Sequence, residues 1–158
     1  MEVRENRIIE QQVKGRISNE IECDVMLHYL GNKDKRCWIW IAICRATKLI
    51  LGFFTGSRGK KAGRQFYNQI KSFTTSRTNW YTDYWKAYTD FIPVNQHTQS
   101  KKETYTVEGY NASFRDDLQR LTRRTRAYSK QKTNLDASLY LYIASHNEKQ
   151  LKKLGYSI

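Results

Sequence analysis

Three acidic residues lie far apart in the sequence, at positions where a fold could gather them for chemistry: Asp24, Asp83 and Glu108. Clustered carboxylates repel one another unless a cation lies between them. Such hard oxygen ligands suit Mg²⁺, which keeps some of its waters and binds substrate phosphates. Two such ions, roughly 3.5–4 Å apart, stabilise the attacking and leaving oxygens of an in-line phosphoryl displacement. The three residues therefore predict metal-dependent phosphoryl transfer, with each of them as a catalytic metal ligand.

Each residue also has a simpler interpretation when it is taken alone. An aspartate in a strand more often faces solvent or binds a turn than takes part in catalysis. Asp83 could begin a turn or cap a helical segment at Tyr84, and Glu108 could be a solvated helix residue. Only a joint placement in the fold distinguishes a metal site from three unrelated acids.

The first of these acids lies in a strand that opens a three-strand meander. Residues 21–30 alternate apolar and mixed positions, which places Asp24 on the face opposite Cys23. The run CWIWIAIC within residues 36–44 has no polar side chain, as expected of a central strand buried on both faces. Residues 48–55 form a third strand. The short connections between them predict antiparallel pairing.

Helices and short strands alternate in the rest of the chain. Residues 60–73 carry apolar side chains at helical spacing, and the short strand that follows ends at Asp83. One or two helical turns come next, and then an edge strand within residues 94–99. A long helix starts near Thr104, and Asn134 can cap a last helix.

This order of elements predicts an α/β fold. The strand–helix–strand unit after the meander requires a right-handed crossover, which sets the fourth strand parallel to the first and beside it. The expected architecture is a ribonuclease H-like mixed five-stranded sheet, an antiparallel three-strand meander plus parallel strands, with helices on both faces. Asp24 and Asp83 then lie on neighbouring strands, and Glu108 lies on the helix that packs across them.

Length and charge limit the possible organisation and partners. A chain of 158 residues has the size of one domain. We expect a polar lead-in over residues 1–19, the catalytic domain over 20–132, and over 133–158 a C-terminal helix packed on or extending it. The net charge of +13 favours a polyanionic partner, with nucleic acid as the first candidate. A ribosome-associated or merely basic protein stays open on charge alone.

The three cysteines are odd in number and form no C-x-x-C pair, which predicts buried, reduced thiols in a cytoplasmic protein. The N-terminus has no apolar segment typical of a signal peptide. The longest apolar run is about nine residues, too short to cross a bilayer. We therefore expect no membrane association.

The stretch from Lys101 to Lys132 reads as a helix with an apolar face and a basic end. Its apolar stripe comprises Val107, Tyr110, Phe114, Leu118 and Leu121. Seven basic residues follow Glu108: Arg115, Arg120, Arg123, Arg124, Arg126, Lys130 and Lys132. A solvated helix face would explain them equally well for an arbitrary helix. Here they interleave with Leu121 and Tyr128 and follow a candidate site, so we expect DNA phosphate contacts that are salt-sensitive and independent of sequence.

Several motifs together resemble the transposase of the insertion-sequence-one family. They are IECD with Tyr29 and Gly31 after it, WIW, YTDYWKAY, and ETYTVEGYN with the FRDDLQRLTRRTRAYSK that follows. The resemblance covers about residues 20–147 and includes the late YIASHN. The interval of 24 residues between Asp83 and Glu108 fits the short spacing of this family.

The resemblance implies a DDE-type enzyme that nicks the ends of its own element and joins the exposed 3′-hydroxyls to target DNA. It makes the three acids ligands of two Mg²⁺ ions, for which Mn²⁺ can substitute. Asn111, Arg115 and Arg120 match helix positions of the family that position DNA or the active-site carboxylate, and Lys130 matches the basic end of that block. His146 is assigned a supporting role through YIASHN.

The chain also departs from the family pattern. Val25 and Leu27 stand where Glu and Trp are usual, and Gly109 replaces an Arg, at a cost to the helix of roughly 1 kcal/mol. Residues 1–19 show no zinc ribbon or helix-turn-helix, so the resemblance implies a partner or fused region encoded in an upstream frame. The other partners implied are double-stranded DNA, as element ends and target, and a second copy in synapsis, at the bacterial nucleoid. An inactive DNA-binding remnant, or a regulator of transposition, is the alternative.

Overall fold

The structure is a computed structural model that describes residues 2–31, 34–124 and 132–157, with side chains described for 7–31, 34–117 and 132–157. The strands are β1 (Glu20–Tyr29), β2 (Arg36–Cys44), β3 (Ile50–Gly56), β4 (Asn79–Thr82) and β5 (His97–Gln99). The α-helices are α1 (Glu2–Val13), α2 (Lys60–Ile70), α3 (Tyr105–Arg124) and α4 (Lys132–Lys153). Short 3₁₀ helices span Lys71–Phe73, Lys86–Asp90, Val94–Gln96 and Lys102–Thr104.

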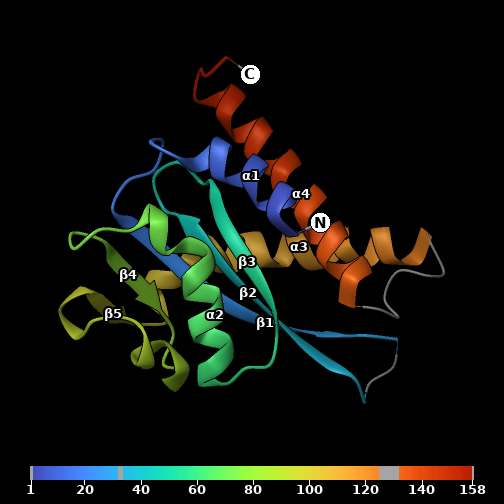
Figure 1. Ribbon diagram of the computed structural model, residues 1–158, viewed down its shortest axis with the longest axis horizontal. Coiled ribbons are helices and arrows are strands. Elements are labelled where there is room, and N and C mark those ends of the chain that lie inside the picture. The colour runs from blue at the N-terminus through green and yellow to red at the C-terminus, as the bar shows by residue number, and fades with distance from the viewer. Residues whose placement is uncertain (1, 32–33, 125–131, 158) are drawn as a thin grey trace.

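The five strands form one mixed sheet in the order β3-β2-β1-β4-β5. The first three make the antiparallel meander, while β4 pairs parallel with β1 and β5 parallel with β4. Figure 1 shows α2 in front of the sheet and α3 behind it. The expected α/β, ribonuclease H-like architecture is therefore confirmed.

β2 is an interior strand of the sheet, between β3 and β1, and it is almost wholly buried. Seven of its nine residues are buried, because helices pack on both faces of the sheet. On one face Trp40 packs against Phe66 of α2, with ring centroids 5.7 Å apart. On the other face Asp24 of β1 lies toward α3, where it accepts a hydrogen bond from Asn111. The prediction of a strand buried on both faces is confirmed.

Three boundaries differ from the sequence-based expectation. The third strand begins at Ile50, because residues 45–47 form a turn and Lys48, which follows it, adopts φ 63°. The edge strand begins only at His97, since residues 94–96 form a 3₁₀ helix. The last helix already includes Lys132, so the prediction that Asn134 precedes and caps it is wrong.

The first helix packs on the rest of the fold. Ile9 and Val13 are 3% and 0% exposed, in the same core as the sheet. Gln12 donates from its side-chain amide to the carbonyl of Ala144 in α4 at 2.9 Å. Figure 1 shows α1 alongside α4, next to β3. The division of the chain at residues 19 and 132 stays a prediction.

Two further expectations concern the thiols and membranes. Cys23, Cys37 and Cys44 are all buried and free, as the sequence predicted. Within the described ranges, every helix is too short or too polar to cross a bilayer.

Candidate active site

Asp24 and Asp83 come from the two central parallel strands. The register pairs Glu20 with Asn79 and Glu22 with Tyr81. Carried two residues further, the same offset sets Asp24 beside Asp83, which directly follows β4. The parallel pairing of β1 and β4 thus brings Asp24 and Asp83, which are distant in sequence, to adjacent positions.

The surroundings of Asp24 raise the pKa of its carboxyl above the ordinary value. Burial is the main cause that raises the pKa of its carboxyl to about 6, and the negative charges of Asp83 and Glu108 raise it further. Hydrogen bonds from the Val25 backbone and the Asn111 side chain oppose the shift. Asp83 and Glu108 therefore both repel the charged form of Asp24, and a cation at this point would relieve that repulsion.

Asp83 is held by a turn at the end of β4. Its Oδ1 accepts a hydrogen bond from the backbone N–H of Trp85 at 3.0 Å, the pattern of an Asx turn. Next to it, the Thr82 hydroxyl donates to the Asp83 carbonyl and lies 2.6 Å from His97 Nε2 of β5. A carboxylate has two oxygens with several lone pairs, so a turn bond and a metal bond are compatible at Asp83.

Glu108 lies in the first turn of α3 and is exposed. Its Oε1 accepts a hydrogen bond from the Thr104 hydroxyl at 2.9 Å, so the carboxylate is turned back along its own helix. Across the part of the chain that the structure describes, no three His, Cys, Asp or Glu side chains are gathered closely enough to hold a metal ion. The fold sets Asp24 and Asp83 at neighbouring positions, on β1 and directly after β4, while the Glu108 carboxylate is bonded to Thr104.

Asn111 is one helical turn beyond Glu108 and only 4% exposed. Its Nδ2 donates to Asp24 Oδ2, while its buried Oδ1 has no hydrogen-bond partner among the described residues. A buried oxygen without a partner is uncommon and calls for a ligand or water. Amide and carboxylate oxygens at one place form the donor set that a hard divalent cation prefers. The residues present therefore fit the Mg²⁺ that the sequence implied.

His146 lies in α4 and joins three elements. Its Nε2 donates to the carbonyl of Lys48 at 2.8 Å, and its ring meets that of Tyr110 edge-on, with centroids 4.9 Å apart. Burial lowers the pKa of the imidazole. These contacts connect α4 to the β2–β3 turn and to α3, next to Asn111. His146 therefore contacts residues that support α3, and its contacts among the described residues do not include the three acids.

The apolar face of α3 docks on the sheet in its first half. Val107 and Phe114 are 1% and 0% exposed, which confirms that part of the predicted stripe, and Tyr110 is half-buried. The Phe114 ring packs on Tyr142 of α4, with centroids 4.2 Å apart. The side chains of Leu118 and Leu121 lie outside the described residues.

The predicted DNA-binding residues are mostly beyond the described side chains. Arg115 is exposed on α3. Arg120, Arg123 and Arg124 belong to the helix, but their side chains are not described. Arg126 and Lys130 lie outside the described residues. The basic track therefore stays a prediction.

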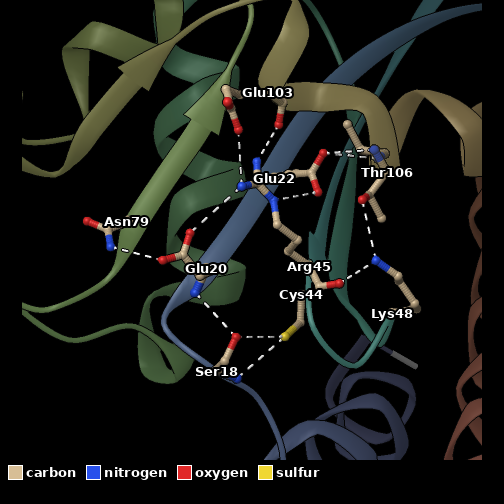
Figure 2. A network of polar contacts seen from close by, with 10 residues as sticks. Ser18, Glu20, Glu22, Cys44, Arg45, Lys48, Asn79, Glu103 and Thr106 are labelled. Carbon is tan, nitrogen blue, oxygen red and sulfur yellow. Dashed lines mark hydrogen bonds and ion pairs between the residues drawn. The ribbon is translucent and has the colours of Figure 1, made fainter.

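Glu22 has a structural role that the sequence reasoning missed. This carboxylate is fully buried on β1, two residues before Asp24. Its Oε1 accepts from the backbone N–H groups of Thr106 and Val107 at 3.0 and 3.4 Å, as Figure 2 shows at Thr106. A carboxylate at a helix N-terminus satisfies free N–H groups and favours the helix dipole. Glu22 thus seats the start of α3 on the strand that carries Asp24.

Arg45, in the β2–β3 turn, completes this anchor. Its Nε donates to Glu22 Oε2 at 3.2 Å, and its Nη1 forms an ion pair with Glu103 at 3.2 Å (Figure 2). Its guanidinium stacks on Tyr81 of β4, 3.7 Å from the ring centroid. Glu22 was detectable as a second acid on the face of Asp24, but the partnership with Arg45 depends on tertiary pairing.

Comparisons with known proteins show which sequences this chain resembles. A family model described as IS1 transposase matches residues 18–148. The insertion element IS1 4 protein InsB of Escherichia coli K12 is 28% identical over 109 residues, 69% of this chain and 64% of that protein. The IS1 protein InsB of Shigella flexneri is 27% identical over 69% of this chain and 82% of its own length. The matched part thus spans less than two thirds of the E. coli protein, and no solved structure matches.

Proposed function

This chain belongs to the IS1 transposase family, and on that basis we propose that it cuts and joins DNA by metal-dependent phosphoryl transfer. Asp24, Asp83 and Glu108 are the catalytic residues of this proposal and hold two Mg²⁺ ions, or Mn²⁺ in their place. The observation that carries it is the partly buried Asp24 carboxyl, which lies beside Asp83 and accepts a hydrogen bond from Asn111 of α3.

The residues of the chain prepare the site for this chemistry. Asn111 orients one oxygen of Asp24, and the Trp85 N–H orients Asp83. Glu108 leaves Thr104 and turns toward the aspartates. When bound, Mg²⁺ neutralises phosphate oxygens and lowers the pKa of a bound hydroxyl or water. Pre-set carboxylates reduce the reorganisation needed when the phosphate enters.

DNA is the substrate in this proposal. The ends of the element are nicked, and their 3′-hydroxyls are joined to target DNA, so two ends are held by at least a dimer. The net charge of +13 supports a polyanionic substrate. Recognition of the ends is assigned to a zinc-ribbon and helix-turn-helix region, fused or encoded in an upstream frame, and the protein acts at the bacterial nucleoid.

Cleavage of an end-labelled element-end duplex tests the proposal. With Mg²⁺ or Mn²⁺ the protein is expected to nick the duplex, and Glu108→Gln is expected to abolish nicking because a metal ligand is lost. Asp116→Asn is a matched control, since Asp116 is exposed on the same helix and should keep full activity. Equal nicking by wild type and Glu108→Gln would overturn the carboxylate assignment.

A second candidate is an inactive DNA-binding remnant or regulator of transposition. The observation that favours it is the orientation of Glu108, which bonds to Thr104 rather than joining the two aspartates. This candidate predicts DNA binding without nicking in either metal. The same duplex assay, run with a binding measurement, separates the two.

A further inference from the structure

Arg58 lies in the loop between β3 and α2, clamped by two tryptophans. Its guanidinium carbon is 3.6 Å from the ring centroid of Trp85 and 4.7 Å from that of Trp38. The Trp85 ring is itself held against this loop, because its indole N–H donates to the Arg58 carbonyl at 2.9 Å. The planar guanidinium is therefore held in place before any ligand arrives.

Among the described residues, none is recorded as a hydrogen-bond acceptor for this guanidinium. Its Nε is buried and makes no hydrogen bond to any residue the structure describes, nor is a carboxylate in those ranges paired with it. Arg45 and Arg64, in contrast, have acidic partners, Glu22 at 3.2 Å and Asp90 at 2.5 Å. The Arg58 guanidinium therefore keeps hydrogen-bonding capacity that no described residue uses, and an external anion would use it.

Arg58 also lies next to the candidate active site. Trp85, on which it stacks, donates its backbone N–H to the Asp83 carboxylate at 3.0 Å. The buried Tyr88 is affected by the charges of both Arg58 and the aspartates. Burial raises the pKa of its phenol, the charges of Asp24 and Asp83 raise it further, and Arg58 lowers it. The arginine and the two aspartates are therefore close enough to Tyr88 to act on it electrostatically.

The surroundings indicate which anion would bind. Exposed Lys60 and Lys61 open α2, and its first turn contains no acid. A guanidinium that stacks on tryptophan keeps N–H groups at its edge, and these match two phosphate oxygens. The Trp85 and Trp38 rings are occupied by Arg58, which argues against base stacking there. We propose that Arg58 binds a backbone phosphate of the DNA beside the carboxylates, next to the bond that is cut.

This inference rests on the proposed function, because it names where the DNA strand lies at that site. Its test is binding of a fluorescent DNA duplex in EDTA, so that no cleavage is involved. Arg58→Gln is expected to weaken binding about tenfold, as for a lost charge-assisted contact. It should also flatten the slope of log K against log salt by roughly 0.9. Arg64→Gln is the matched control, since Arg64 is already paired with Asp90.

A second measurement needs no variant. Arginine-selective modification of the wild-type protein, mapped by mass spectrometry, is expected to show Arg58 protected by DNA and Arg64 not. Equal modification of Arg58 with and without DNA would overturn the inference, as would a folded Arg58→Gln that binds like Arg64→Gln. If DNA protects Arg58 and Arg58→Gln weakens binding, but the wild type never nicks DNA, the proposed function alone would be overturned.

Discussion

The fold places the Asp24 carboxyl where its negative charge is disfavoured unless a proton or a cation is bound. Its pKa is about 6 in the folded protein, against 3.8 ordinarily, chiefly because it is buried. Between these two pH values the folded state keeps a proton that the unfolded chain releases. The stability of the metal-free protein therefore falls as the pH rises through this window. A divalent cation at Asp24 would remove that penalty.

Substitution of Asp24 by Asn tests this electrostatic cost. At pH 7.5 without metal, Asp24→Asn is expected to be more stable than wild type by about 1–3 kcal/mol, since it removes a disfavoured charge. Near pH 4 the two should have similar stability. Urea unfolding at both pH values, with and without Mg²⁺, is the measurement. Mg²⁺ should stabilise only the wild type, and a variant that is less stable at every pH would contradict the account.

Gly109 is the departure from the family pattern that adjoins Glu108, and its surroundings are open. A Cβ atom built there meets nothing within 4 Å. Gly109→Ala is therefore expected to stabilise the protein by about 0.5–1 kcal/mol, through helix propensity. Gly63→Ala in α2 is a control that should not gain, because its Cβ would lie 3.0 Å from Phe91. Chemical unfolding of both variants checks this, and equal changes would disprove it.

At the scale of elements, the position of α3 depends on the anchor formed by Glu22 and Arg45. The helix carries both Glu108 and Asn111, so any tilt would move both relative to Asp24. Truncation of Glu22 would leave Arg45 and the first N–H groups of α3 without their carboxylate.

Glu22→Ala is expected to destabilise the protein by about 3–5 kcal/mol, as breaking a buried ion pair does. It should also reduce nicking, because α3 loses its seat. Glu20→Ala is the control, since Glu20 is 37% exposed and 4.0 Å from Arg45, and should cost at most about 1 kcal/mol. Thermal unfolding of both variants is the measurement. Similar melting temperatures for the two would show that α3 is held mainly by its apolar face.

The whole molecule carries a charge of +13, which sets how it meets DNA. Binding that releases counterions from about six phosphates should weaken about a thousandfold between 50 and 200 mM salt. Duplexes of unrelated sequence should bind with similar affinity, because phosphate contacts carry no sequence information. Anisotropy titrations over this salt range are the measurement. Affinity that hardly depends on salt would mean that charge is not the main contribution.

Much of the architecture followed from the sequence, because strand and helix periodicity is local. The apolar run of residues 36–44 predicted a central strand, and the crossover rule predicted β4 beside β1. The boundaries of two elements were predicted less accurately. The 3₁₀ helix at Val94–Gln96 shortened β5 to three residues, and α4 already includes Lys132.

The sequence by itself determined the fold class, the alternation that places Asp24 opposite Cys23, and the family. Tertiary structure decided which side chains meet. The register set Asp24 beside Asp83, and the α3 docking gave Asn111 to Asp24 but left Glu108 bonded to Thr104. It also joined Glu22 to Arg45. Periodicity reflects interactions within a few residues, whereas these contacts span tens of residues and depend on how strands pair and helices pack.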